Sequence, residues 1–307
     1  MDAGQHAGRP ATLESPASNA FAAALCSDTA ARLGVRALVI KGESLRHWEL
    51  RTDRVSADAD LLFADEADVD AVVAALTQHG WYRRPIGTSG AGLIGHSVTI
   101  SHPRWPTSLD LHYRFPGLPP VAFEALWERR VATRVAARAV WIPDRAGSIV
   151  VWALHSLRGA PDEPRHAREL EALVGRIIPA LTPQQRADLA AGVLVLGADH
   201  ALREVPAFAA LLGDRTADVD PDTTALWRRE TERAHAATAW VQILREAPAR
   251  QRPYLLCRAL WPSRLDLTLM DPELVDTPVG RVRSRLRRVG RLARRVRDRR
   301  SLDGLSG

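Results

Sequence analysis

The sequence predicts an α+β protein with an N-terminal mixed β-sheet flanked by helices, an all-helical C-terminal domain and a basic helical tail. Apolar runs of strand type alternate with amphipathic helical segments up to residue 142. From residue 148 onward the apolar spacing is helical, and clusters of Pro, Gly and Asp separate the segments. These patterns place a domain boundary near Pro143, and the expected parts are a disordered leader at 1–18, an α/β domain at 19–143, a helical domain at 144–275 and an arginine-rich tail at 276–307.

The α/β part begins with a helix, a strand and a second helix. Apolar residues recur at helical spacing over 18–33, and Gly34 ends that helix. A short run rich in β-branched residues at 35–40 is typical of a buried strand. The second helix is expected to begin at Gly42.

The rest of the α/β part alternates in the same way. A helix is expected at 66–79, because acidic residues crowd its first turn and Gly80 follows its last turn. The glycine-rich residues 87–95 are expected to form a flexible loop. Strands, identified by period-2 alternation or short apolar runs, are expected at 56–63, 81–84, 96–102, 108–113 and 140–142. The helical part is expected to contain helices at 148–157, 164–178, 183–196, 223–245 and 253–260.

The composition is that of a soluble globular protein, with 46% hydrophobic and 25% charged residues. No apolar run approaches the roughly 20 residues that cross a bilayer, so no transmembrane segment is expected. The N-terminus lacks the basic and apolar regions of a secretion signal. Cys26 and Cys257 lie too far apart in the sequence to indicate a disulfide framework or a metal knuckle. The expected location is the cytoplasm.

The positive charge of the chain belongs to its tail. Residues 281–300 contain eleven arginines and one aspartate, so the remainder carries a net charge of about −4 in a chain of net charge +6. Val282, Leu286, Val289 and Val296 would share one face of a helix among these arginines. A basic amphipathic helix of this kind could contact an acidic partner, nucleic acid or a membrane surface. A solvated C-terminus fits the composition equally well.

Lys41 is the only lysine among the 42 lysine and arginine residues of the chain. An ammonium group is a compact charge, whereas a guanidinium is a planar fork, so this position favours the compact charge. Gly42 and Ser44 follow at the expected strand-to-helix junction, where free amide groups favour phosphate oxygens. An ordinary turn with a surface lysine is the alternative.

Asp58 and Asp60 lie on one face of an expected strand that continues into the apolar residues 61–63. Two neighbouring carboxylates repel each other unless a cation lies between them, so removing either charge should leave the metal-free fold intact. Asp110, on another strand of the same sheet, is a candidate third carboxylate around Mg²⁺. His112 shares its face and is a candidate for orienting a phosphate or a carboxylate, or else a structural residue.

These motifs, taken in order, resemble the uncharacterised nucleotidyltransferase families of the polymerase-β-like superfamily, which are often found in bacterial biosynthetic clusters. The resemblance spans about residues 35–175. The family's usual Gly-Gly or Gly-Ser is here Gly42-Glu43-Ser44, and its aspartate in the helical region is replaced by Glu169 or Glu171. The matching segments are 38–42 with Leu45, Arg54-x-Ser56-x-Asp58-x-Asp60, Gly80-Trp81-Tyr82, His96, 109–113 and, more loosely, Leu154-His155.

The resemblance implies a nucleotidyltransferase-like sheet and metal-dependent transfer of a nucleoside monophosphate. The donor would be a nucleoside triphosphate such as ATP, and the acceptor would be a hydroxyl of a small molecule or a peptide, in a biosynthetic pathway. The catalytic residues, which would also bind Mg²⁺ or Mn²⁺, are Asp58, Asp60 and Asp110. The residues that would contact the nucleotide are Lys41, Gly42, Ser44, Arg54 and His112.

Two other classes of function fit the same residues. A metal-dependent phosphohydrolase would use the three carboxylates to activate water, although no histidine-rich cluster favours it. A non-catalytic protein that binds a nucleotide or a partner is the second alternative, and the basic tail is the feature that favours it.

Overall fold

The computed structural model describes residues 15–51, 58–84, 96–159, 164–218, 248–260 and 277–286, together with single residues and short pieces between 221 and 244. Arg54, the expected loop at 87–95 and most of the expected leader, of the helix at 223–245 and of the tail lie outside the described residues. The chain divides into two compact units. The first comprises Met1–Arg84, His96–His155 and Leu170–Thr224, and the second comprises Pro85–Gly95, Ser156–Glu169 and Ala225–Gly307.

A five-stranded mixed sheet forms the centre of the first unit, in the order β1-β2-β5-β4-β3. The strands β2 and β5 pair in parallel, and the other neighbours pair antiparallel. This arrangement confirms the predicted mixed sheet and places β2 and β5, which carry the candidate carboxylates, side by side. The strands are β1 (Ala37–Ile40), β2 (Asp58–Phe63), β3 (Tyr82–Arg83), β4 (Ser97–Ser101) and β5 (Ser108–His112).

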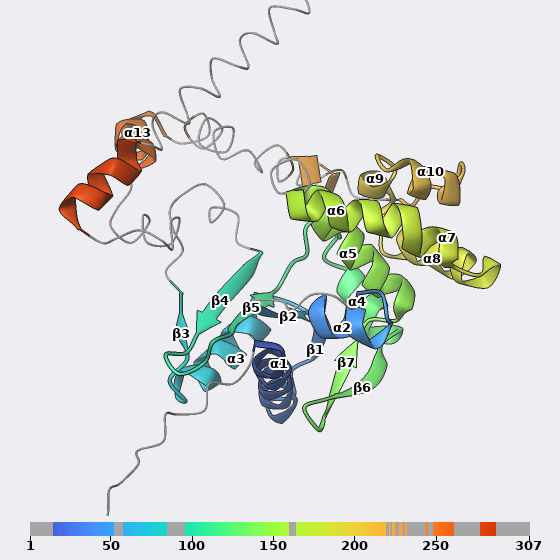
Figure 1. The fold of residues 1–307 in the computed structure, drawn as a ribbon, viewed down its shortest axis with the longest axis horizontal. Coiled ribbons are helices and arrows are strands. Elements are labelled where there is room, and N and C mark those ends of the chain that lie inside the picture. Colours follow the sequence, from blue (N-terminus) through green and yellow to red (C-terminus); the bar gives the residue numbers. More distant parts are fainter. Residues whose placement is uncertain are drawn as a thin grey trace, which may run out of the picture. The chain divides into compact units, whose positions relative to one another are not determined.

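Helices α1 (Ser15–Arg32) and α3 (Glu66–Thr77) pack beside each other against the sheet (Figure 1). They cover the face to which the odd-numbered apolar residues of β2 and β5 point, so Leu61 and Leu111 are fully buried in the core beneath them. The even-numbered residues, which include the candidate carboxylates, therefore point to the opposite face. The expected alternation along both strands is confirmed.

Both ends of α3 lie close to where the sequence predicted them, and the structure shows what holds each end. The side chain of Asp65 accepts a hydrogen bond from the amide of Asp68 at 2.9 Å and caps the first turn. Gly80 follows the last turn with φ 88°, a conformation that favours glycine, and a Cβ there would lie 2.9 Å from the ring of His102. Both ends of the helix thus carry their own sequence signals.

Helix α4 (Ala122–Glu128) and the hairpin of β6 (Val131–Val135) and β7 (Arg138–Ile142) complete the α/β part. Only the end of β7 was predicted. The hairpin turns through Ala136 and Ala137, which have φ of 47° and 64°. Such a turn usually contains Asn or Gly, so an Ala-Ala pair gives no signal in the sequence. The guanidinium of Arg130 lies 4.2 Å from the ring centroid of Trp127 and 4.5 Å from that of Trp141, which joins α4 to the hairpin.

After Ile142 the described chain is helical, as predicted. That this change marks a domain boundary near Pro143 stays a prediction. The expected helix at 164–178 is divided, because residues Leu173–Ile177 form a π-helical turn, η1. The remaining helices are α5 (Arg145–Gly159), α6 (Pro164–Ala172), α7 (Ile178–Ala180), α8 (Pro183–Val195), α9 (Asp199–Leu202), α10 (Pro206–Leu212) and α13 (Arg252–Leu260), of which α9 and α10 were not predicted. Helix α2 (Gly42–His47) follows β1, as predicted.

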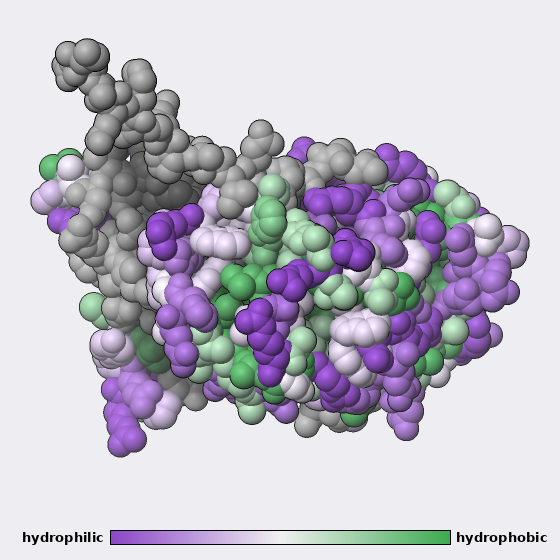
Figure 2. All heavy atoms as spheres, turned by 90° about the horizontal axis from the view of Figure 1, so that it is seen from below, coloured by the Kyte–Doolittle hydropathy of each residue, from purple (hydrophilic) through white to green (hydrophobic). Residues whose placement is uncertain are grey.

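No helix in the described part of the chain is both long and apolar enough to cross a membrane. On the face seen in Figure 2, apolar residues appear among predominantly hydrophilic ones. In the described start of the tail, Val282 and Leu286 are exposed, and the apolar face predicted for residues beyond 286 lies outside the described residues. The role of the tail stays a prediction.

Candidate functional site

Asp60 and Asp110 lie directly opposite each other on the parallel strands β2 and β5. Adjacent strands are about 4.8 Å apart, so side chains at paired positions on one face are neighbours. Asp60 is buried and Asp110 is half-buried. The sheet register therefore brings together two carboxylates that are separated by fifty positions in the sequence, as expected from the alternation along both strands.

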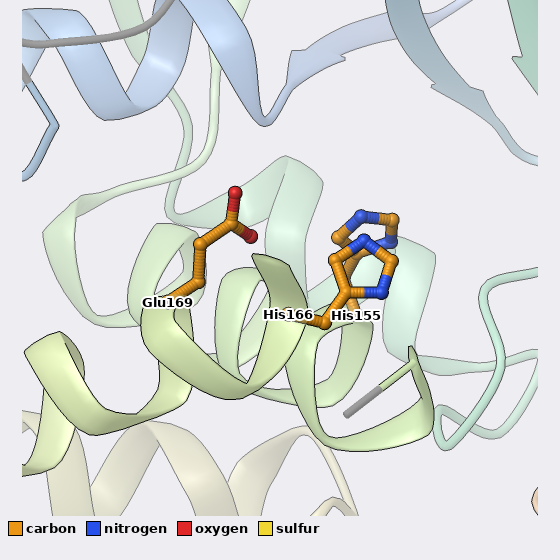
Figure 3. Close-up of side chains that lie close together, drawn as sticks. All are labelled: His155, His166 and Glu169. Atoms are coloured by element: carbon orange, nitrogen blue, oxygen red, sulfur yellow. The ribbon is translucent and has the colours of Figure 1, made fainter. Parts of the chain in front are cut away.

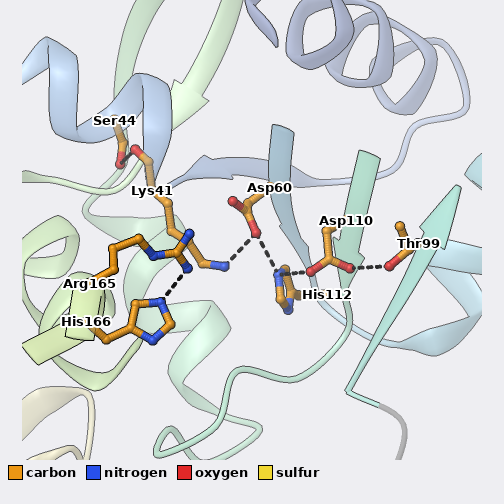
Figure 4. Close-up of polar contacts among 8 residues, drawn as sticks. All are labelled: Lys41, Ser44, Asp60, Thr99, Asp110, His112, Arg165 and His166. Atoms are coloured by element: carbon orange, nitrogen blue, oxygen red, sulfur yellow. Dashed lines mark hydrogen bonds and ion pairs between the residues drawn. The ribbon is translucent and has the colours of Figure 1, made fainter. Parts of the chain in front are cut away.

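His112 bridges these two carboxylates. Its Nε2 atom lies 3.1 Å from Oδ1 of Asp60 and 3.1 Å from Oδ2 of Asp110 (Figure 4). The possible ligand atoms of the three residues all lie within 4.8 Å of one another. The other ring nitrogen of His112, Nδ1, is buried and has no hydrogen-bond partner in the described part of the chain. The three side chains thus form one compact polar group on the face of the sheet away from α1 and α3.

Lys41 supplies a second positive charge to this group. Its Nζ atom lies 2.5 Å from Oδ1 of Asp60, with side-chain exposures of 11% and 3% for the two residues, and 5.8 Å from the ring centroid of Phe115. Lys41 has φ 57° and ψ −124° and is the residue before helix α2. Residues other than glycine rarely adopt this backbone conformation, which costs about 1–3 kcal/mol. Residues with such strained backbones cluster at functional sites.

The backbone of the β1-to-α2 junction is supported from within. The hydroxyl of Ser44, which is fully buried, donates a hydrogen bond to the carbonyl oxygen of Lys41 at 3.0 Å. Gly42 is the first residue of α2. Ser44 therefore holds the turn that positions Lys41, whereas the sequence predicted a contact between Ser44 and the nucleotide. That contact stays a prediction.

The electrostatics of the group favour an ionised Asp110 beside a protonated His112 in the metal-free protein. Burial opposes the ionisation of Asp110, but His112, Lys41 and Ser97 together hold the pKa of its carboxyl well below the usual range. Burial likewise opposes the protonation of His112, but Asp110 and Asp60 outweigh it and raise the pKa of the imidazole. In the described structure, Lys41 and His112 compensate the charges of Asp60 and Asp110. The expected repulsion between Asp58 and Asp60 stays a prediction.

Asp58 stands somewhat apart from this group. It begins β2 on the same face as Asp60, is half-buried and pairs in register with Ser108. It is not among the residues whose ligand atoms lie within 4.8 Å of one another. The structure therefore brings together two of the three predicted carboxylates with His112 and Lys41, and the role of Asp58 as a metal ligand stays a prediction.

The donor atoms of the group suit a divalent cation. Carboxylate oxygens are the ligands of Mg²⁺ and Mn²⁺, and an imidazole nitrogen is a common ligand of the later transition metals. Two carboxylates within 4.8 Å of each other and on neighbouring strands can share one ion. A cation here would take over Asp60 from Lys41, which a flexible lysine side chain permits. Asp60 and Asp110 are therefore suitable ligands for a metal ion, although in the described structure they contact Lys41 and His112 instead.

Several side chains around the group were not predicted as part of it. The hydroxyl of Thr99 on β4 donates to Oδ1 of Asp110 at 3.1 Å, and the ring of His96 stacks on that of His112 with centroids 5.7 Å apart. The ring of Phe115 also contacts that of His112, and their centroids are 5.7 Å apart. The period-2 alternation of β4 was the available signal for Thr99, because Thr99 pairs in register with Asp110.

Glu169, one of the two glutamates expected in place of the family's aspartate, lies on α6. Figure 3 shows it with His166, about one helical turn before it. The hydroxyl of Ser156 on α5 donates to Oε2 of Glu169 at 3.3 Å, so this hydrogen bond joins α5 to α6. A Cβ at Gly159 would overlap the ring of His166, which shows how closely the helices approach there. The possible ligand atoms of His155, His166 and Glu169 lie within 4.8 Å of one another, so these three side chains form a second polar group.

No protein-family model matches the sequence. No curated protein matches it either. Solved structures of similar fold include an antigenic nucleotidyltransferase-like protein from Paracoccidioides brasiliensis, which is 14% identical, with a TM-score of 0.38 over 71% of this chain and 100% of that chain. JHP933 from Helicobacter pylori is 14% identical, with a TM-score of 0.31 over 75% and 97% of the two chains. The nucleotidyltransferase toxin MenT4 from Mycobacterium tuberculosis is 14% identical, with a TM-score of 0.30 over 84% and 94%.

Proposed function

We propose that this chain is a metal-dependent nucleotidyltransferase that moves a nucleoside monophosphate from a nucleoside triphosphate to a hydroxyl group. The observation that carries the proposal is the register of β2 and β5, which sets Asp60 opposite Asp110 on one face of the sheet. A lysine lies 2.5 Å from the first of these carboxylates. Two carboxylates with an adjacent ammonium can hold a metal–triphosphate complex, because they bind its cation while the ammonium binds its phosphate oxygens.

Asp60 and Asp110 would hold Mg²⁺ or Mn²⁺, with Asp58 as a further ligand from the start of β2. The ion, when bound, neutralises charge that develops on the attacking and leaving oxygens during displacement at the α-phosphorus. Asp110 would also accept the proton of the acceptor hydroxyl, since its carboxylate is partly exposed. The pKa of its carboxyl lies below the usual range, so it is ionised at neutral pH.

Lys41 would exchange partners when the nucleotide binds. In the described structure its ammonium neutralises Asp60. In the complex, the Lys41 ammonium would contact the β- and γ-phosphates, where a compact point charge is effective. Gly42 and the first turn of α2 would lie against the same phosphates, and Arg54 is a further candidate contact. His112, held between both carboxylates at 3.1 Å from each, would keep them aligned and face the triphosphate.

The acceptor is proposed to be a small hydroxylated molecule or a peptide. This part of the proposal, like the choice of nucleoside triphosphate, rests on the resemblance of the motifs. A cytoplasmic location is also proposed, from the composition of the chain and its two distant cysteines.

One observation favours the second candidate function, a non-catalytic nucleotide-binding protein. Lys41 and His112 already compensate both carboxylates, so the group is stable without a metal. A site of this kind could bind a nucleotide through Lys41 and His112 without turning it over. The two candidates differ in whether Asp110 is needed for chemistry.

Incubation with Mg²⁺ and nucleoside triphosphates labelled at the α- or γ-phosphorus tests the proposal. Pyrophosphate release with α-label on an acceptor supports transfer, and it should disappear in Asp60→Asn and Asp110→Asn. Asp70→Asn is the matched control, because Asp70 lies on α3 and pairs only with the exposed Arg83 in the described structure. Release of inorganic phosphate would instead indicate a phosphohydrolase. Binding without turnover would indicate the non-catalytic alternative.

A further inference from the structure

A cavity lies among the helices of the C-terminal part of the first unit, away from the carboxylate group. Its volume is about 520 Å³, which is within the usual range of small-molecule sites. Side chains from η1, α7, α8 and α10 line it, and most of them are aliphatic: Val174, Ile178, Ala190, Ala207, Ala210 and Leu211. The cavity is thus large enough for a short hydrocarbon chain.

Two arginines, Arg186 and Arg215, complete the lining of this apolar cavity. Arg186 donates from Nε to the carbonyl oxygen of Leu181 at 3.1 Å and from Nη2 to that of Pro179 at 2.7 Å. Its guanidinium is therefore fixed against the loop that joins α7 to α8. A fixed guanidinium loses less side-chain entropy when it binds a ligand than one that moves freely in solvent.

Arg215 is held in the same way by backbone carbonyl oxygens. It donates from Nε to the carbonyl oxygen of Leu212 at 3.0 Å and from Nη2 to that of Leu211 at 2.7 Å, at the C-terminal end of α10. Within the described part of the chain, neither arginine pairs with a carboxylate, and the Nη1 group of each has no hydrogen-bond partner. Two preoriented cations thus border the cavity with donors to spare and no anion beside them.

We infer that this cavity binds an organic anion that combines a carboxylate or phosphate group with an apolar chain. The guanidinium fork matches both headgroups, and the aliphatic walls match the chain. The π-helical turn η1 supplies Val174 to the wall, and such turns occur frequently at functional sites because they displace side chains from the regular helical positions. The inference concerns residues that the proposed transfer reaction does not use.

Calorimetric titration of the full chain with decanoate and with decyl phosphate tests this inference. Saturable binding of one molecule per chain is expected for at least one of them, and the preferred probe identifies the headgroup. Decyltrimethylammonium has the same chain with the opposite charge and should not bind. Acetate and inorganic phosphate, which lack the chain, should bind at least about tenfold more weakly.

Two variants and one control locate the binding. The double variant Arg186→Gln, Arg215→Gln should weaken the preferred probe by about tenfold or more, since it removes both charged donors. Arg176→Gln, an exposed arginine on η1 that does not line the cavity, should leave affinity unchanged. Ala210→Leu adds a side chain at an exposed position of the lining and should also abolish binding without lowering the melting temperature.

The inference is overturned if neither anionic probe binds, or if decyltrimethylammonium binds as tightly as they do. It is also overturned if Ala210→Leu leaves the affinity of the anionic probe unchanged while the variant is folded. The last comparison does not depend on the arginines, whose bonds to backbone carbonyls also stabilise the helices.

Discussion

The ammonium of Lys41 lies 2.5 Å from the carboxylate of Asp60, and the two side chains are only 11% and 3% exposed. A buried ion pair of this kind is strongly destabilised when one partner is removed, because the other charge is left without compensation. The pair also joins the strained turn after β1 to the centre of β2. It therefore links the backbone conformation of Lys41 to the position of the carboxylate that the proposed reaction needs.

The first prediction concerns this ion pair. Asp60→Asn should lower the free energy of unfolding of the metal-free protein by about 3 kcal/mol, because it leaves the Lys41 ammonium buried beside a neutral amide. This differs from the sequence-based expectation, in which removal of the charge leaves the fold intact. Lys41→Met should cost less, since His112 still contacts Asp60. Urea unfolding of both single variants and of the double variant measures these values.

The double variant provides the control for this cycle. Its loss should be smaller than the sum of the two single losses by at least about 1 kcal/mol, since neither charge is left alone. Asp70→Asn removes an exposed pair with Arg83 and should change stability by no more than about 0.5 kcal/mol. Additive losses at Lys41 and Asp60 would show that the two side chains do not interact in solution.

The second prediction concerns the dependence of stability on pH without metal. Burial opposes the charge on Asp110, but its pKa is lowered, so its contribution is present above about pH 4 and is lost as the pH falls through the lowered pKa. The pKa of His112 is raised despite burial, so its contribution is present below about pH 6.5 and is lost as the pH rises through the raised pKa. Between these values both contributions are complete.

Urea midpoints measured in the presence of a chelator from pH 3 to 9 check this window. The wild type should lose stability on both sides of it, and His112→Gln should flatten the decline on the alkaline side. Parallel curves for the wild type and His112→Gln would contradict the coupling between His112 and the carboxylates.

The third prediction concerns the two cysteines. Cys26 is fully buried in α1 beneath the sheet, and this burial raises the pKa of its thiol, so it should not react in the native protein. Cys257 on α13 is exposed and should react at once. Thiol titration should count one group per chain in buffer and two in denaturant. Two fast groups in buffer would show that α1 does not pack on the sheet as described.

The sequence predicted the parts of the fold whose local signals agree with their surroundings. Period-2 alternation identified β2 and β5, and acidic residues with Gly80 marked the ends of α3. The hairpin after α4 escaped prediction because Ala136 and Ala137 take up a turn that alanine rarely forms. The residues of η1 carry no recognisable sequence signal for a π-helical turn.

The candidate site was predicted to the level of its charged residues and no further. Asp60, Asp110, His112 and Lys41 do come together, because strand register and the junction after β1 are set by local pattern. Their counter-ions were not foreseen, since which cation meets which carboxylate depends on side-chain directions in three dimensions. The same holds for Ser44, whose hydroxyl turns inward to the Lys41 carbonyl, and for the positive φ of Lys41 itself.

The most direct test of the account is the binding of Mn²⁺ together with a non-hydrolysable nucleoside triphosphate, followed by electron paramagnetic resonance. The wild type should bind the ion in the presence of the nucleotide with a saturable loss of the free-ion signal. Asp60→Asn and Asp110→Asn should each weaken this binding by about tenfold or more, and Asp70→Asn should not. Equal binding of Mn²⁺ and nucleotide by all four proteins would contradict the assignment of Asp60 and Asp110 as the metal-binding carboxylates.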